Sequence, residues 1–134
     1  METVFLTEKD YERLHLLVQA QRSSGAPAQV EGLCKELRTA QIIPSEEVPV
    51  DVVTMNSLVR LREKKSGTVM ELTITYPKDA NVAERKISVL APVGTAILGR
   101  KVGQEVACAA PRGMLSYEIE EVIYQPEAAG DFYL

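Results

Sequence analysis

The chain has 134 residues, 46% of them hydrophobic and 25% charged, and its formal net charge is -4. This length suits one domain with a small appendage, and the apolar content can fill a core without disulfides or metals. The acidic balance and the absence of Trp argue against direct nucleic-acid binding, which uses basic patches and stacking aromatic rings. No apolar run approaches the roughly 20 residues of a membrane-spanning helix, so we expect no membrane contact.

The two cysteines and the N-terminus indicate the compartment. Cys34 and Cys108 fall in different predicted elements, and the run METVFLTEKD has no basic segment followed by an apolar one. This pattern lacks a secretory signal and favours reduced thiols in the cytoplasm. We expect both cysteines to be small buried hydrophobic residues rather than a disulfide pair.

The first third of the chain predicts a helical hairpin. The run Thr7-Glu8-Lys9-Asp10 has the form of a capping box and predicts a helix that continues to about Gln21. Turn residues follow, and Pro27 suits the first turn of a second helix that apolar spacing extends to about Ala40. With so short a loop between them, the two helices should pack antiparallel as a short coiled coil.

The rest of the chain reads as strands. Ile42 to Pro49 is predicted to be an extended linker, with a domain boundary near Ser45. Beyond Val50 the apolar period changes to two, and it predicts strands near residues 59–62, 70–76, 104–110 and 116–125. In the last strand the alternation slips, which indicates either a β-bulge at Glu120-Glu121 or a strand partly buried on both faces.

The stretch from Ile87 to Val106 carries three backbone signals in close succession. Alternation predicts a strand over Ile87–Ala91, and Pro92 suits the start of a short helix that includes Thr95 to Leu98. Gly99 and Gly103 can each adopt the positive φ that ends a helical turn. Together with the hairpin, this order of elements predicts an α+β fold.

These residues carry a family resemblance. Ile87–Val106, Pro111-Arg112-Gly113 and Tyr117–Tyr124 resemble the C-terminal domain of the bacterial Gre transcript-cleavage factors. Residues 45–49, 51–57 and 124–131 resemble the Gre-related regulators of nucleoside diphosphate kinase. The resemblance implies a coiled-coil arm over residues 1–45, followed over residues 46–134 by an antiparallel β-sheet domain of the FK506-binding-protein (FKBP) type with one short helix.

The resemblance also implies a role at the arm tip. In Gre factors the arm enters the secondary channel of RNA polymerase, and acidic residues at its tip help to hold a second Mg²⁺ that activates water for transcript cleavage. Glu31 is the nearest acid here, and near a helix start a carboxylate more often complements the helix dipole. The tip itself has no Asp or Glu; its residues are Arg22, Ser23, Ser24, Gly25, Ala26 and Pro27. We therefore expect no metal, no cofactor and no catalysis, and a protein that occupies the channel and competes with Gre factors.

A docking surface follows from the same resemblance. In Gre factors the segment that ends in Ser-Pro contacts a coiled coil of the polymerase β′ subunit, at the positions that here are Leu90, Ala91 and Pro92. The alternative is that the whole segment is core. We expect this alternative for Ile87, Val89, Ile97 and Leu98, and leave both readings open for Leu90 and Pro92.

Other functions have less support. An FKBP-like domain could be a prolyl isomerase, but such a pocket is lined by aromatic side chains, and the chain has only 5% of these. Direct binding to nucleoside diphosphate kinase is a second alternative. The chain has no Gly-rich phosphate loop, so an indirect effect on that kinase and on nucleotide levels, through transcription, fits better.

Several conspicuous residues have structural explanations. His15 has no nucleophile or metal-ligand partner in sequence, so a packed or hydrogen-bonded imidazole is expected. Arg60, Arg62 and Lys64-Lys65 form either a basic face or an ordinary solvated one. The terminal Phe132-Tyr133-Leu134 either packs on the sheet or forms an exposed hook.

Overall fold

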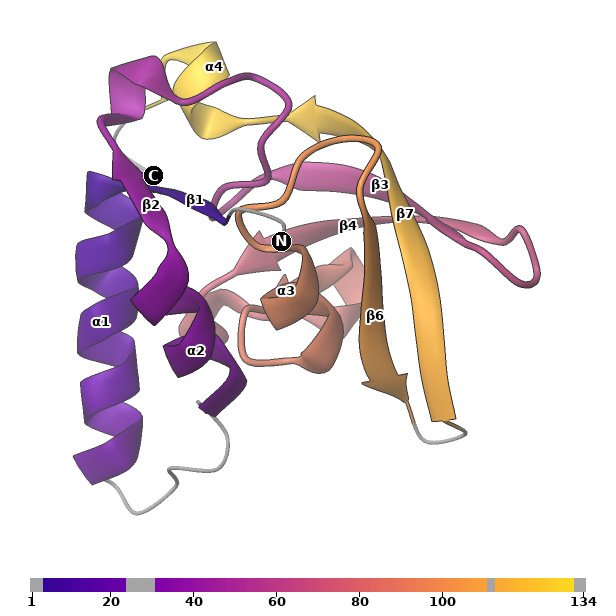
Figure 1. The fold of residues 1–134 in the computed structure, drawn as a ribbon, viewed down its shortest axis with the longest axis horizontal. Helices are drawn as coiled ribbons and strands as arrows, with labels where there is room; N and C mark the ends of the chain where they lie inside the picture. The colour runs from indigo at the N-terminus through magenta and orange to yellow at the C-terminus, as the bar shows by residue number, and fades with distance from the viewer. Residues whose placement is uncertain (1–3, 24–30, 111–112, 132–134) are drawn as a thin grey trace.

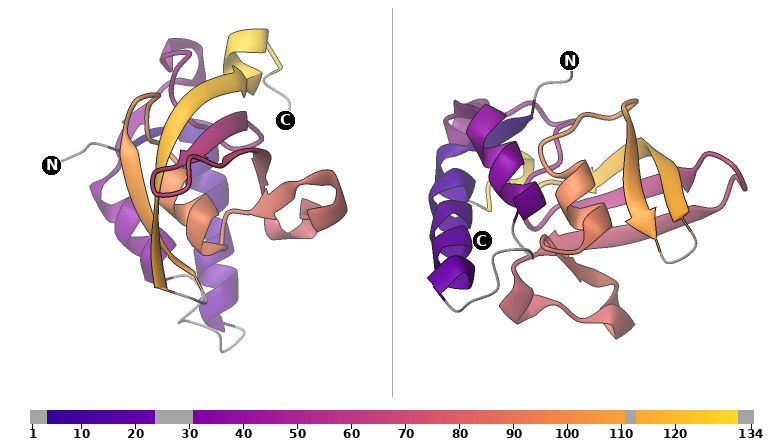
Figure 2. Two further views of the ribbon diagram at one scale, coloured as in Figure 1. Left: turned by 90° about the vertical axis from the view of Figure 1, so that its right-hand side faces the viewer. Right: turned by 60° about the horizontal axis from the view of Figure 1, so that its bottom comes forward.

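The computed structural model describes residues 4–23, 31–110 and 113–131. Two helices stand beside a curved sheet, and the short helix labelled α3 lies between this helical pair and the sheet (Figures 1 and 2). The N-terminal part consists of β1 (Phe5–Thr7), α1 (Glu8–Ser23), α2 (Glu31–Thr39) and β2 (Gln41–Ile43). The remainder follows in the order η2 (Ser45–Glu47), β3 (Leu58–Glu63), β4 (Val69–Thr75), η3 (Pro77–Asp79), η4 (Val82–Glu84), β5 (Lys86–Ser88), α3 (Pro92–Ile97), β6 (Glu105–Ala110), β7 (Gly113–Tyr124) and α4 (Pro126–Ala129).

The helical hairpin starts at the predicted cap. The backbone N–H of Asp10 donates to Thr7 Oγ1 at 3.1 Å, as an N-cap requires. From this cap α1 runs antiparallel to α2 (Figure 1), and their buried apolar side chains are Leu14, Val18, Leu33, Cys34 and Leu37. The expected antiparallel hairpin is therefore present, whereas supercoiling of a coiled-coil kind stays a prediction.

A small parallel sheet joins the two ends of the hairpin. The chain is extended from Ile42, as expected, but Ile42 and Ile43 belong to β2, which pairs in parallel with β1 through Leu6↔Ile42. The sequence did not predict this pairing. The backbone N–H of Gln41 also donates to the carbonyl of Val4 at 2.7 Å. Strands of three residues are too short for an alternating pattern to identify them. The linker then continues with the 3-10 turn η2, and the residues on either side of it, Pro44 and Val48, are extended.

The main sheet has five strands in the order β5-β4-β3-β7-β6, and only the β4–β5 pair is parallel. Its last strand, β7, starts three residues earlier than predicted, at Gly113. The predicted slip near Glu120-Glu121 is a real irregularity: Arg60 pairs with Glu121 and Leu61 with Ile119, so Glu120 has no opposite residue. A second irregularity lies between the pairs at Leu58 and Val59. Bulges of this kind increase strand twist and let one long strand follow a curved sheet.

One hydrophobic core serves the hairpin and the sheet. Leu14 and Leu33 of the hairpin belong to the same buried cluster as Leu61 and Ile119 of the sheet and Ile97 of α3. This mixture of helices and a mixed sheet confirms the α+β class. The FKBP type and the division at residue 45 stay predictions. Among the residues that the structure describes, no helix is long and apolar enough to cross a membrane.

Candidate docking surface

The corner between β5 and α3 is held by hydrogen bonds that end the strand early. The N–H of Leu90 donates to Ser88 Oγ at 3.1 Å, and the N–H of Ala91 donates to the Ser88 carbonyl at 3.0 Å. The prediction of a strand over Ile87–Ala91 is therefore wrong beyond Ser88, because the chain turns at Val89 and Leu90. The helix begins at Pro92, as predicted and as the fixed φ of proline favours. It ends at Ile97, one residue before the predicted Leu98.

Gly94 lets α3 lie directly on this corner. A Cβ atom at Gly94 would lie 2.5 Å from the carbonyl oxygen of Ser88 and 3.1 Å from Val89 Cα. The hydroxyl of Thr95 adds a hydrogen bond of 2.6 Å to the Val89 carbonyl. The sequence analysis missed Gly94, although a glycine inside a six-residue helix is the signal that could have found it.

The corner residues divide into buried and accessible ones. Val89, Ile97 and Leu98 are fully buried, which confirms the core reading for these three, and Ile87 is partly buried against the same cluster. Leu90 and Ala91 are half-buried, and Pro92 is exposed. The corner therefore presents accessible apolar atoms on a rigid base.

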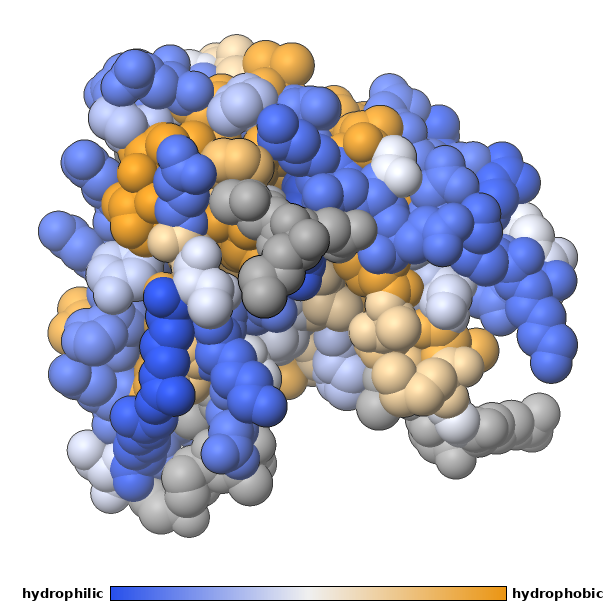
Figure 3. Space-filling view, in the orientation of Figure 1, coloured by the Kyte–Doolittle hydropathy of each residue, from blue (hydrophilic) through white to orange (hydrophobic). Residues whose placement is uncertain are grey.

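Leu90 and Pro92 line an open groove of about 360 Å³, which we call the docking groove. Its second wall is α2, through Gly32, Lys35 and Glu36, and its third is formed by Ala107 and the 68%-exposed Met114. Figure 3 shows apolar surface over β6 and β7 across a hollow from the helical hairpin. Ala91 does not line the groove, so the structure brings together two of the three predicted docking residues.

The charged groups of α2 fix one side of the docking groove. Glu36 lies 3.5 Å from the guanidinium of Arg100, the residue that follows the α3 turn and Gly99. Burial raises the pKa of Glu36, while the Arg100 charge opposes this shift. The ion pair ties the arm to the α3 corner and leaves Lys35, which is exposed, at the groove rim.

The predicted arm tip lies only partly within the described residues. Arg22 and Ser23 end α1, and Glu31 is the exposed first residue of α2, while Ser24 to Pro27 lie outside the described residues. Arg22 Nη2 donates to Cys34 Sγ at 3.0 Å and so links the two helices. Among residues 4–23, 31–110 and 113–131, no group of three or more His, Cys, Asp and Glu could hold a metal ion.

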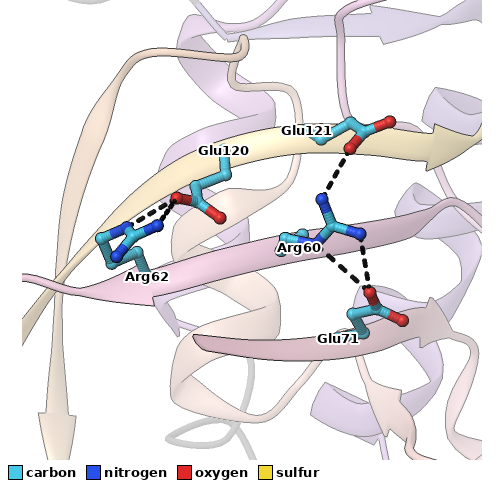
Figure 4. A network of polar contacts seen from close by, with 5 residues as sticks. All are labelled: Arg60, Arg62, Glu71, Glu120 and Glu121. Atoms are coloured by element: carbon cyan, nitrogen blue, oxygen red, sulfur yellow. Dashed lines mark hydrogen bonds and ion pairs between the residues drawn. The ribbon is translucent and has the colours of Figure 1, made fainter. Parts of the chain in front are cut away.

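The proposed basic strand face is an ordered charge ladder (Figure 4). Arg60 contacts Glu71 at 3.0 Å and Glu121 at 2.8 Å, and Arg62 pairs with Glu120. Lys64 pairs in the same way with Glu105 and Glu118. The basic groups are therefore neutralised by glutamates on neighbouring strands, so this face is solvated and not basic.

His15 and the two cysteines, which the sequence also singled out, have structural roles. His15 stacks on Tyr11 with ring centroids 6.1 Å apart, and its Nε2 lies 3.1 Å from Gln19 Nε2. Cys34 and Cys108 are free and buried. The terminal residues 132–134 lie outside the described residues.

Comparison with known proteins places this fold. The family model described as "Transcription elongation factor, GreA/GreB, C-term" matches residues 48–124. The chain belongs to the GreA/GreB family. Over 133 residues it is 40% identical to the regulator of nucleoside diphosphate kinase from Escherichia coli K12, covering 98% of this chain and 97% of that protein. It is 36% identical over 88 residues to the transcription elongation factor GreA of Syntrophomonas wolfei, covering 66% of this chain and 55% of that one.

A solved structure agrees with the sequence relatives. The prokaryotic transcription elongation factor GreA/GreB from Nitrosomonas europaea superimposes with a TM-score of 0.75 at 39% identity, covering 91% of this chain and 100% of that one. The resemblance stated from sequence is thereby confirmed. These GreA/GreB-family relatives are named as regulators and transcription factors, so this protein is a transcription-factor-like regulator.

Proposed function

We propose that this protein binds RNA polymerase at the rim of the secondary channel, competes there with Gre factors, and does not stimulate transcript cleavage. Membership of the GreA/GreB family supports polymerase as the partner. The observation that carries the docking part is the position of Leu90 and Pro92, accessible on a groove whose other wall is the arm. A partner seated there touches the globular part and the arm together.

The docking groove suits a helical partner. Its accessible lining is apolar at Leu90, Pro92 and Met114, and it carries Lys35 at one rim. A helix with an apolar stripe and flanking charges fills such a groove and exchanges water for apolar contact at about 25 cal/mol per Å². The coiled coil of the polymerase β′ subunit is the helical partner that we propose.

The arm supports the non-catalytic part of the proposal. At about 1.5 Å per residue, the 16 residues of α1 span about 24 Å. Between Arg22 and Pro27 the sequence has no Asp or Glu, and a hard Mg²⁺ ion needs carboxylate oxygens. The arm therefore occupies space in the channel and brings no metal-binding pair to its tip.

The name of the Escherichia coli relative suggests an effect on nucleoside diphosphate kinase. We propose that this effect is indirect and acts through transcription. A pull-down of the kinase from lysate with the full chain tests the direct route, and recovery of the kinase without polymerase would contradict the indirect one.

Binding to purified core RNA polymerase tests the docking site. We expect Leu90→Asp to weaken binding by about tenfold or more, because the carboxylate must be desolvated in an apolar contact. Val82→Asp is the matched control, since Val82 is 81% exposed on η4 and does not line the docking groove. Unchanged affinity of a folded Leu90→Asp variant would rule out this groove as the docking site.

Stalled elongation complexes test the mechanism. We expect the wild-type chain to displace a Gre factor and to reduce Gre-dependent transcript shortening, while causing no shortening alone. Leu90→Asp should lose the inhibition and Val82→Asp should keep it. Rapid shortening that depends on this protein alone would overturn the non-catalytic assignment.

A further inference from the structure

A second and larger groove lies between α1 and the η3 turn, and we call it the α1–η3 groove. Its volume is about 770 Å³, within the range of roughly 300–1,000 Å³ that is usual for small-molecule sites. Its lining comes from Arg13, Leu16 and Leu17 of α1, Asn56 of the loop before β3, and Tyr76 and Lys78 around η3. Among the described residues, it shares no lining residue with the docking groove.

The apolar part of the α1–η3 groove is accessible to a ligand. Leu16 is 64% exposed, although it stands on a helix next to the half-buried Leu17. Pro77 adds a rigid apolar ring from the opposite side. An exposed leucine alone needs no explanation, but one that faces further apolar atoms across a groove forms a surface for the body of a ligand.

Tyr76 places a buried hydroxyl group at the wall of the α1–η3 groove. Its hydroxyl is buried beside the Arg13 guanidinium, which is close enough to lower the hydroxyl's pKa in the manner of a weak hydrogen bond. Within the described residues, no group meets the hydroxyl at full hydrogen-bonding geometry. A buried hydroxyl without a hydrogen bond is unfavourable, so it calls for a partner from outside the chain. Burial also raises the pKa of Tyr76, which keeps its proton available for donation.

The other polar groups of the α1–η3 groove are mostly donors. Arg13 and Lys78 carry positive charge, the Asn56 amide can donate, and Asp79 is the one acid among the described lining residues. Asn56 has a φ of 66° and is held there by a 2.7 Å hydrogen bond from its N–H to the carbonyl of Ile74. The charges of Asp10 and Glu127 also reach Tyr76 from outside the lining, so the groove is rich in hydrogen-bond donors, and its two cations face the ligand directly.

We propose that the α1–η3 groove binds a small organic anion with an apolar or ring-shaped body. The body lies on Leu16, Leu17 and Pro77, and a carboxylate or phosphate group accepts hydrogen bonds from Arg13, Lys78 and the Tyr76 hydroxyl. This site is separate from the polymerase contact, and the proposal stands or falls independently of it.

Amide chemical-shift titration of the full chain tests the site with three anionic probes. ADP carries a ring and phosphates, octanoate carries an apolar chain and a carboxylate, and inorganic phosphate carries charge alone. Adenosine and 1-octanol are their uncharged counterparts. We expect ADP or octanoate to give saturable shifts centred on Leu16, Tyr76 and Lys78 with a dissociation constant in the millimolar range or below, and the preferred probe distinguishes a ring-bearing phosphate ligand from an aliphatic carboxylate. Phosphate and the uncharged compounds should bind at least about fivefold more weakly.

Variants connect the shifts to the groove. Lys78→Gln and Tyr76→Phe should each weaken binding of the preferred probe about fivefold. Lys65→Gln, at an exposed lysine in the β3–β4 turn, should leave the affinity unchanged. Tyr76→Phe retains the ring and so preserves the fold. The proposal is overturned if no probe gives saturable shifts, if the uncharged compounds bind as tightly as the anions, or if Lys65→Gln weakens binding as much as Lys78→Gln.

Discussion

Asp10 links the base of the arm to the sheet domain. Its carboxylate Oδ2 accepts a hydrogen bond of 3.1 Å from the N–H of Met55. The side chain is only 3% exposed, and its burial raises its pKa from 3.8 to about 6, with the charge of Glu127 acting in the same direction. The bond from Met55 opposes this shift but does not cancel it. A charged Asp10 is therefore a net cost to the folded state at neutral pH.

Replacing Asp10 by Asn removes this cost. Because the folded-state pKa lies above the unfolded value, the stabilisation from protonated Asp10 is fully present below about pH 3.8 and is lost as the pH rises through about 6. The shift of about two pKa units corresponds to about 3 kcal/mol. We expect the free energy of unfolding of Asp10→Asn, relative to wild type, to increase by up to about this amount between pH 4 and 7.5. Urea denaturation at several pH values measures this difference.

The matched control for Asp10 is Glu12→Gln, an exposed carboxylate on the same helix. The difference in free energy of unfolding between Glu12→Gln and wild type should stay nearly constant over the same pH range. If the difference in free energy of unfolding between Asp10→Asn and wild type were also independent of pH, Asp10 would not titrate near pH 6 in the folded protein.

At the level of elements, the β5–α3 corner depends on close backbone approach. The glycine at position 94 lies where a methyl group would meet the Ser88 carbonyl oxygen at 2.5 Å. Gly32, on the facing helix α2, is different, because a methyl group there would lie 3.5 Å from Thr95 Cγ2, an ordinary contact. The two glycines thus form a natural pair for comparison.

Gly94→Ala should destabilise the protein by about 1–3 kcal/mol, since backbone atoms must shift to admit the methyl group. Gly32→Ala should be neutral or stabilising by up to about 1 kcal/mol, because alanine favours the helix. Chemical denaturation of both variants measures these effects. Equal stability of Gly94→Ala and wild type would show that the corner is not held by close packing.

The sequence predicts the elements that have local signals. Thr7, Pro92 and the slip at Glu120-Glu121 each act through neighbouring residues, and each is found where expected. Gly99 and Gly103 have the expected positive φ values of 77° and 93°. Elements that depend on distant partners are not predicted. The β1–β2 pair is an example, since its strands have three residues each and are joined through the whole hairpin.

The docking groove escapes sequence analysis for the same reason. The resemblance to Gre factors identified Leu90 and Pro92. The alternation of apolar and polar residues, by contrast, predicts only that a residue faces a core, and it does not predict which elements pack against each other. The second and third walls come from α2 and from the β6–β7 region, far from the corner in sequence. Gly32 and Met114 are therefore recognised as lining residues of the docking groove only in the folded structure.

Across the whole molecule, the shared core decides how the arm behaves. Leu33 of α2 is buried in one cluster with Ile97 of α3 and with the sheet residues. The Glu36–Arg100 pair and the Asp10–Met55 hydrogen bond add polar links between the two parts. A division at residue 45 would favour separate unfolding of the arm, whereas these contacts favour a single cooperative unit.

Leu33→Ala distinguishes these two possibilities. Truncation of this buried side chain should cost about 2–5 kcal/mol, while Leu16→Ala, at an exposed position of α1, should change stability by less than about 0.5 kcal/mol. Tyr11 lies in α1, whereas Tyr76 follows β4 and Tyr117 and Tyr124 lie in β7, so the fluorescence is measured with Tyr11 replaced by Phe. If the core is shared, the helical circular-dichroism signal and this tyrosine fluorescence should move together to lower denaturant in Leu33→Ala. A helical signal lost first, with the fluorescence transition unmoved, would show that the arm unfolds independently. Coincident unfolding transitions would mean that the shared core holds the arm in a fixed orientation. A partner in the docking groove would then bind an arm that is already positioned.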